Sequence, residues 1–152
     1  MTSVSYETIF KLFLGSITDY KLVSLSDEDA ETIMTEYLHK ALSATYLSRL
    51  FSSMTLDDEM KQLTYAMTYD SGKDETDFVC NAIAKWMVYE WYHNQVNSVI
   101  NSAQFFGGSE QKFYSQQTHS SELRAVEESM YKEARGFVMD RGWIHNSYLG
   151  GK

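Results

Sequence analysis

The stretch 77–103, DFVCNAIAKWMVYEWYHNQVNSVINSA, decides the fold. The whole chain lacks proline, the commonest helix breaker, so long helices are permitted throughout. A helix that is apolar almost all round is either central to its fold or shared with a partner. The spacing predicts one such helix over 77–103. Its apolar residues recur at helical intervals and include Phe78, Val79, Ala82, Ile83, Trp86, Met87 and Tyr89.

Two helices are predicted before this stretch. The first covers about 6–17, where apolar residues recur at the i, i+3, i+4 spacing of a helix. The second begins after Ser26, which forms a pattern like a capping box with Asp29. Its apolar stripe continues to about Tyr46.

A fourth helix is predicted after the central stretch, from Ser120 or Ser121 to about Arg141, with Gly142 at the C-cap position. The segment 105–119 before it contains Gly107 and Gly108, and two adjacent glycines break a helix. We therefore expect a loop over 105–119.

The segment 47–77 between the second and third helices is interrupted by serine, aspartate and glycine, which predicts a loop. Within it, apolar and polar residues alternate from Leu63 to Tyr69, as in a strand, so the loop can hold a short β-hairpin. The predicted fold is therefore mainly α, a small bundle of about four helices with that hairpin as its only β-structure.

The length of 152 residues suits one domain, which we place at 1–142, followed by a C-terminal tail over 143–152. The net charge is −8, and the lysines and arginines are scattered singly. Proteins that bind nucleic acid usually carry a basic patch. Because the basic residues here are scattered, sequence-specific nucleic-acid binding is not expected. The single cysteine, Cys80, forbids an internal disulfide and fits a reducing cytosol.

Neither secretion nor membrane insertion is predicted. Residues 1–6 lack the basic start of a secretory signal, and no apolar region follows them. The longest stretch without charged residues, 91–109, is rich in asparagine, glutamine and serine, which a bilayer core would reject. We expect a soluble protein made inside the cell.

No motif predicts catalysis, a metal or a cofactor. The four histidines lie far from one another, and none pairs with Cys80 at the spacing of a metal site. Gly107 and Gly108 lack the context of a phosphate-binding loop. The acidic run 57–59 lacks the spacing of a calcium loop and is interpreted as a solvated loop. The sequence therefore predicts a protein that is not an enzyme.

The chain is rich in aromatic residues, with eleven tyrosines, eight phenylalanines and three tryptophans. Tyrosine and tryptophan are favoured at interfaces, where one end of the side chain is dry and the other polar. Four aromatics lie outside the predicted helices and are interpreted as contacts with a partner: Phe113, Tyr114, Trp143 and Tyr148.

The stretch 111–124, QKFYSQQTHSSELR, resembles a recurring signature of tailed-bacteriophage head–tail connector proteins. These are the adaptor or head-completion subunits beneath the portal. In that group a Lys-Phe-Tyr-Ser loop leads through a histidine into a helix that starts with Glu-Leu-Arg. The opening residues 6–14, the run 25–29 and the apolar helix around Trp91 fit the same group.

The resemblance implies a ring, expected to be dodecameric, that docks on the portal ring and extends its DNA channel toward the tail. The implied partners are the portal, neighbouring copies, the next neck or tail-side connector protein, and genomic DNA that passes without sequence-specific binding. The implied location is the neck of the virion, with no membrane. Residues expected to contact the portal or a neighbouring subunit are Phe113, Tyr114, Arg124, Trp143, Ile144, Tyr148 and Leu149.

A second hypothesis fits the residues without the resemblance. Amphipathic helices and surplus aromatics are also what a soluble helical partner-binding or regulatory protein without catalytic activity needs. Portal binding and ring formation separate the two hypotheses.

Overall fold

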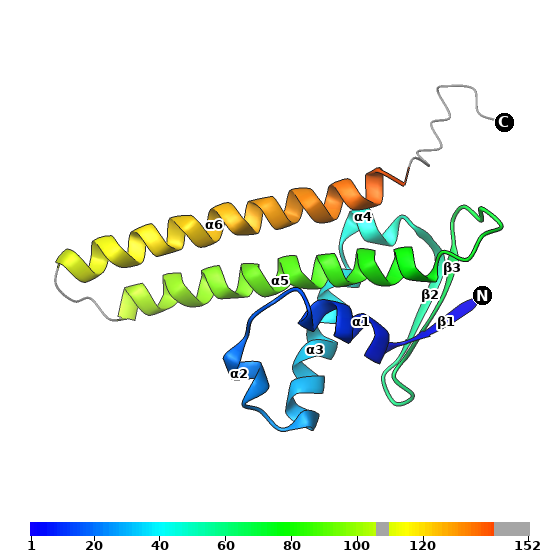
Figure 1. Cartoon of the computed structure of the whole chain (residues 1–152), viewed down its shortest axis with the longest axis horizontal. Helices are drawn as coiled ribbons and strands as arrows, with labels where there is room; N and C mark the ends of the chain where they lie inside the picture. The colour runs from blue at the N-terminus through cyan, green and yellow to red at the C-terminus, as the bar shows by residue number, and fades with distance from the viewer. Residues whose placement is uncertain (106–109, 142–152) are drawn as a thin grey trace.

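The computed structural model describes residues 1–105 and 110–141, with side chains throughout except at 20, 21 and 99–118. Figure 1 shows a small sheet at one end, a group of shorter helices beside it, and two long helices lying side by side. In chain order the elements are β1 (Thr2–Ser5), α1 (Tyr6–Leu14), α2 (Tyr20–Val23), α3 (Asp27–Leu42), α4 (Thr45–Ser48), β2 (Phe51–Asp57), β3 (Gln62–Met67), α5 (Thr76–Phe105) and α6 (Glu110–Met139).

The three strands form one antiparallel sheet in the order β1-β3-β2. Side chains directly opposite one another on neighbouring strands share a face of the sheet. Val4 pairs with Leu63, and both are buried in the core. Ser3 and Thr55 both pair with Thr64, so these three hydroxyl side chains form a row across the outer face.

The prediction of a mainly α bundle of about four helices is wrong, because the domain is mixed and contains this three-stranded sheet. The segment 47–77 forms the hairpin β2–β3, and β1 completes the sheet on the far side of β3. β1 has only four residues and one buried side chain. Because its partner strand lies about sixty residues away, no local pattern reveals it.

α5 is the central helix of the domain, as predicted, and it extends from Thr76 to Phe105. α1 and α3 contact it from one side and α6 from the other (Figure 1). Cys80 is among its buried residues, and burial raises the pKa of its thiol to about 11. The cysteine is therefore a small core residue. The buried residues of α5 are Val79, Cys80, Ala82, Ile83, Ala84, Trp86, Met87, Val88, Trp91 and Val96.

The first two predicted helices are present but shorter. α1 ends at Leu14, with Gly15 at its C-cap, and not at residue 17. The predicted cap of the second helix is confirmed: Ser26 Oγ accepts a hydrogen bond of 3.2 Å from the backbone N–H of Asp29. α3 ends at Leu42, and the separate turn α4 follows before β2.

α6 begins at Glu110, about ten residues before the predicted start at Ser120 or Ser121. The predicted loop over 105–119 is therefore wrong from Glu110 onward. This stretch has no glycine or proline, so the backbone can be helical although the side-chain pattern shows no stripe for a core. Gly142 and the tail 143–152 lie outside the described residues.

Among the described residues, no helix is both long enough and apolar enough to cross a bilayer.

Candidate functional site

The residues predicted to contact partners lie on α6 and beyond it. Phe113 and Tyr114 are in the first turns of α6, not in a loop, and their side chains are not described. Arg124 is exposed on the same helix. The four predicted tail anchors lie outside the described residues: Trp143, Ile144, Tyr148 and Leu149.

The acidic run 57–59 forms the turn between β2 and β3. Asp57 Oδ1 accepts hydrogen bonds from the backbone N–H groups of Glu59 at 3.1 Å and Met60 at 2.8 Å. Lys61 closes the turn in the left-handed region, with φ of 53°. In the described part of the chain, no three histidine, cysteine, aspartate or glutamate residues gather as a metal site would require.

Asp58 ties this turn to two helices. The buried Tyr6 donates its hydroxyl to Asp58 Oδ1 at 2.7 Å, and His39 Nε2 lies 3.1 Å from both carboxylate oxygens. These contacts join the start of α1, the last turn of α3 and the hairpin. The interpretation of 57–59 as a merely solvated loop missed this tie, because its members are far apart in sequence.

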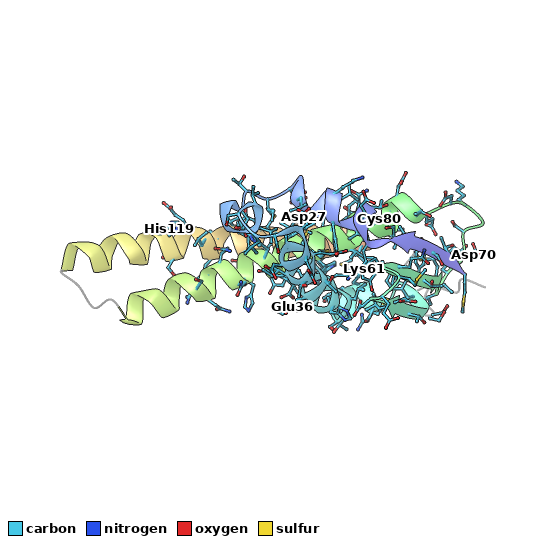
Figure 2. The ribbon with its side chains drawn as sticks, turned by 90° about the horizontal axis from the view of Figure 1, so that it is seen from below. Asp27, Glu36, Lys61, Asp70, Cys80 and His119 are labelled. Carbon is cyan, nitrogen blue, oxygen red and sulfur yellow. The ribbon has the colours of Figure 1, made fainter. Side chains whose placement is uncertain are left out.

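The contact between Tyr6 and Asp58 shifts the pKa values of both groups. The hydrogen bond from Tyr6, followed in importance by His39, lowers the pKa of Asp58. Burial, together with the Asp58 carboxylate, raises the pKa of Tyr6. An open groove of about 480 Å³ lies beside the tie, and Glu36 and Lys61, labelled in Figure 2, are among its lining residues. Charges of both signs line it, so it selects no anion or cation.

Replacing Tyr6 by phenylalanine is expected to lower the free energy of unfolding at pH 7 by about 1 kcal/mol, the usual net value of one hydrogen bond. The pKa of Asp58 is lower in the folded state, so its contribution is present above its unfolded value of 3.8 and is lost as pH falls further. The pKa of Tyr6 is raised, so its contribution is lost as pH rises above 10.0. In Tyr6→Phe, the free energy of unfolding should therefore fall less steeply with pH at both the acidic and the alkaline end.

Urea unfolding at a series of pH values from about 2.5 to about 10.5, a range that spans the ordinary pKa values of aspartate and tyrosine, measures this effect. The matched control is Tyr92→Phe, a half-buried tyrosine of α5. Equal losses in the two variants, with unchanged pH profiles, would show that Asp58 does not depend on Tyr6.

The two long helices are joined along the half that lies over the rest of the domain. Lys85 Nζ lies 2.6 Å from Glu133 Oε1, and further along His93 bonds to Glu127. Between these pairs, Tyr131 packs edge-on against the Trp86 ring, with centroids 5.6 Å apart. These contacts fix how α6 lies on α5.

Beyond the His93–Glu127 pair, α5 and α6 continue as a distal arm, formed by residues 97–105 and 110–126. Both views show this arm extending past the shorter helices (Figures 1 and 2), and Figure 2 labels His119 on it. None of its described side chains is buried. The described arm is thus two helices without a third element against them.

At the C-terminal end of α6, Arg141 bonds to the loop before α5. Arg141 Nε donates to Glu75 Oε1 at 2.8 Å, and Nη2 bonds to the second carboxylate oxygen. The same Nη2 donates to the carbonyl of Tyr69 at 3.4 Å, and the guanidinium lies 5.4 Å from the Phe78 ring centre. The two charged side chains are only 8% and 17% exposed. These contacts hold the end of α6 against the loop before α5.

The sheet is a neutral area on an acidic protein. Asp57 is the only charged residue in the three strands. Within the described chain, β1 and β2 pair with β3 alone, so each presents one free edge. Natural proteins commonly protect free edges with charged residues or proline, and these strands have no proline and that single charge at one end.

Comparison with known proteins returns no match: no family model, curated protein or solved structure resembles the chain.

Proposed function

We propose that this protein is a structural subunit of a tailed-bacteriophage neck, a head–tail connector that assembles as a ring beneath the portal. The resemblance of 111–124 to the connector signature motivates the choice of class. The structural observation that supports it most is the distal arm, described above as a pair of helices with no buried side chain among those described.

The arm supports an assembly role for an energetic reason. Helices in water gain most of their stability from packing an apolar face against other elements. A pair of helices that extends past its own domain gains little of this stability, unless another molecule lies against it. The α6 part of the arm, residues 110–126, is about 25 Å long at 1.5 Å per residue, so the arm can reach a neighbour beyond its own domain.

The charge of the protein also suits a DNA channel. The net charge is −8, and the exposed first turn of α3 carries Asp27, Glu28 and Asp29. Carboxylates that face the lumen of a ring would repel the phosphates of passing DNA. DNA would then move through the ring without being held.

Binding to the portal tests the proposal. The protein is mixed with purified portal rings from the same genome, and the sedimented complex is measured for stoichiometry and imaged by electron microscopy. We expect twelve copies in a ring coaxial with the portal. Protein that stays in the supernatant at concentrations of ~10 µM, where ordinary specific complexes form, would overturn the proposal and favour the regulatory alternative.

Deleting residues 143–152 is expected to reduce portal binding at least ~100-fold, on the order expected when clustered aromatic anchors are removed from an interface. The folded domain should keep its thermal unfolding temperature. A matched control variant, Ser129→Ala, changes an exposed residue of α6 outside the signature and leaves the tail intact, so it should bind the portal normally. Normal co-sedimentation of the truncated protein would show that the tail does not anchor it.

A further inference from the structure

We infer that neighbouring copies join through the sheet: the free edge of β2 in one copy receives the free edge of β1 from the next. This inference depends on the proposed ring in one respect: copies of the protein must associate with one another. It identifies a surface, the two sheet edges, that neither the signature nor the distal arm points to.

The edges are open to pairing along most of their length. A bulge between Phe51 and Ser53 disturbs the first end of β2, but its register with β3 is regular from Ser53 to Asp57. Of the exposed side chains of this span, Ser53 and Thr55 are small and uncharged, and Asp57 at its end is charged. β1 likewise exposes Thr2, Ser3 and Ser5. Such an edge is a template for another strand.

Charge favours a second copy over a charged partner. Two molecules of net charge −8 repel each other over most of their surfaces. The strands of the sheet carry little of this charge, because Asp57 is their only charged residue.

The geometry favours a head-to-tail arrangement. Pairing β2 with β2 of a second copy would give a closed dimer and leave both β1 edges free. Joining β2 to β1 of the next copy satisfies both edges, and a repeated contact of this kind closes a ring. Because β1 and β2 both run antiparallel to β3, they are parallel to each other, so the new joint is parallel.

The proposed pairing of β2 with β1 of the next copy is weak by itself. β1 offers only four residues, and parallel pairing is slightly less stable per residue than antiparallel pairing. Assembly would therefore depend on additional contacts, such as those of the distal arm, or on a portal that places the copies side by side.

Engineered cysteines can crosslink β2 of one copy to β1 of the next through a disulfide. Ser3 and Thr55 flank Thr64 within one copy, at two strand spacings or about 10 Å, too far for a disulfide inside the chain. The native Cys80 is 1% exposed and does not compete. Two double variants, Ser3→Cys with Thr55→Cys and Ser3→Cys with Ser53→Cys, sample two registers of the joint.

After mild oxidation of concentrated protein, we expect one of the double variants to give a ladder of covalent trimers and larger species on a non-reducing gel. Each single variant should give at most traces of dimer. A strong dimer from Thr55→Cys alone would overturn the inference in favour of a two-fold joint between β2 strands. Absence of a ladder from both double variants would also overturn it.

A charged residue placed on the edge provides the second test. A lysine on the same edge, Ser53→Lys with Thr55→Cys or Thr55→Lys with Ser53→Cys, should reduce the yield of the ladder at least tenfold, because lysine blocks edge pairing. The matched control is Ser129→Lys on the exposed side of α6, which makes the same charge change and should leave the yield unchanged. Equal yields with both lysines would overturn the inference. A ladder without portal binding would refute the proposed function alone, whereas portal binding without a ladder would refute the sheet joint alone.

Discussion

Replacing Arg141 by alanine is expected to lower the free energy of unfolding by about 3 kcal/mol, because removing one partner of a largely buried ion pair leaves the other uncompensated. The carboxylate of Glu75 would keep its position, with only 17% of its side chain exposed. The carbonyl of Tyr69 would also lose a donor, and the Phe78 ring would lose the guanidinium beside it. Urea unfolding at pH 7 measures the loss.

Two further variants identify the cause. Lys132→Ala breaks the pair with Glu128, whose side chains are 72% and 67% exposed, and should cost less than about 0.5 kcal/mol. The double variant Arg141→Ala with Glu75→Ala should lose less than the sum of its single losses, because no unpaired carboxylate is left. Additive losses would mean that the two residues do not act as a pair.

Replacing Ile83 by alanine is expected to lower the free energy of unfolding by about 3–4 kcal/mol, since it removes a large buried side chain and leaves a cavity. Ile83 is fully buried on α5, the helix that contacts α1, α3 and α6. Alanine is the strongest helix former, so the loss reports packing and not helix propensity. Thermal and urea unfolding of the same samples provide the measurement.

Val126→Ala is the control for this prediction, because it also shortens a branched side chain on a long helix. Val126 is 36% exposed, and the variant should cost less than about 1 kcal/mol. Ile83→Val should lie between the two, near 1 kcal/mol. A loss below about 1.5 kcal/mol for Ile83→Ala would contradict the central position of α5 in the core.

The parts of the fold that could be predicted are those determined by neighbouring residues. The cap at Ser26 acts on a residue three positions away, and the apolar pattern of 77–103 lies within one helix. β1 could not be predicted in this way, because its four residues become a strand only through pairing with β3. The start of α6 could not be predicted for a related reason: the stretch from Glu110 carries no stripe of apolar residues, and such a stripe is what marks a helix in a sequence.

The features of the candidate site likewise divide into those that neighbouring residues determine and those that distant residues determine. The buried and unreactive Cys80 could be predicted from residue type, because free cysteine usually behaves as a small hydrophobic residue. The tie of Asp58 to Tyr6 and His39 could not be predicted, since it joins residues 52 and 19 positions apart. The free sheet edges were missed together with the sheet. Their one trace in the sequence is the scarcity of charge in the segments 2–5, 51–57 and 62–67.

The pairing of β1 with β3 has a consequence for how the protein is made. β1 leaves the ribosome before β3, which follows some sixty residues later. The chain entropy of closing so long a loop must be overcome before the sheet is complete. The hairpin β2–β3 can form locally in the meantime, with the second edge of β3 unoccupied. β1 is therefore synthesised before the rest of the sheet and is among the last of its strands to pair.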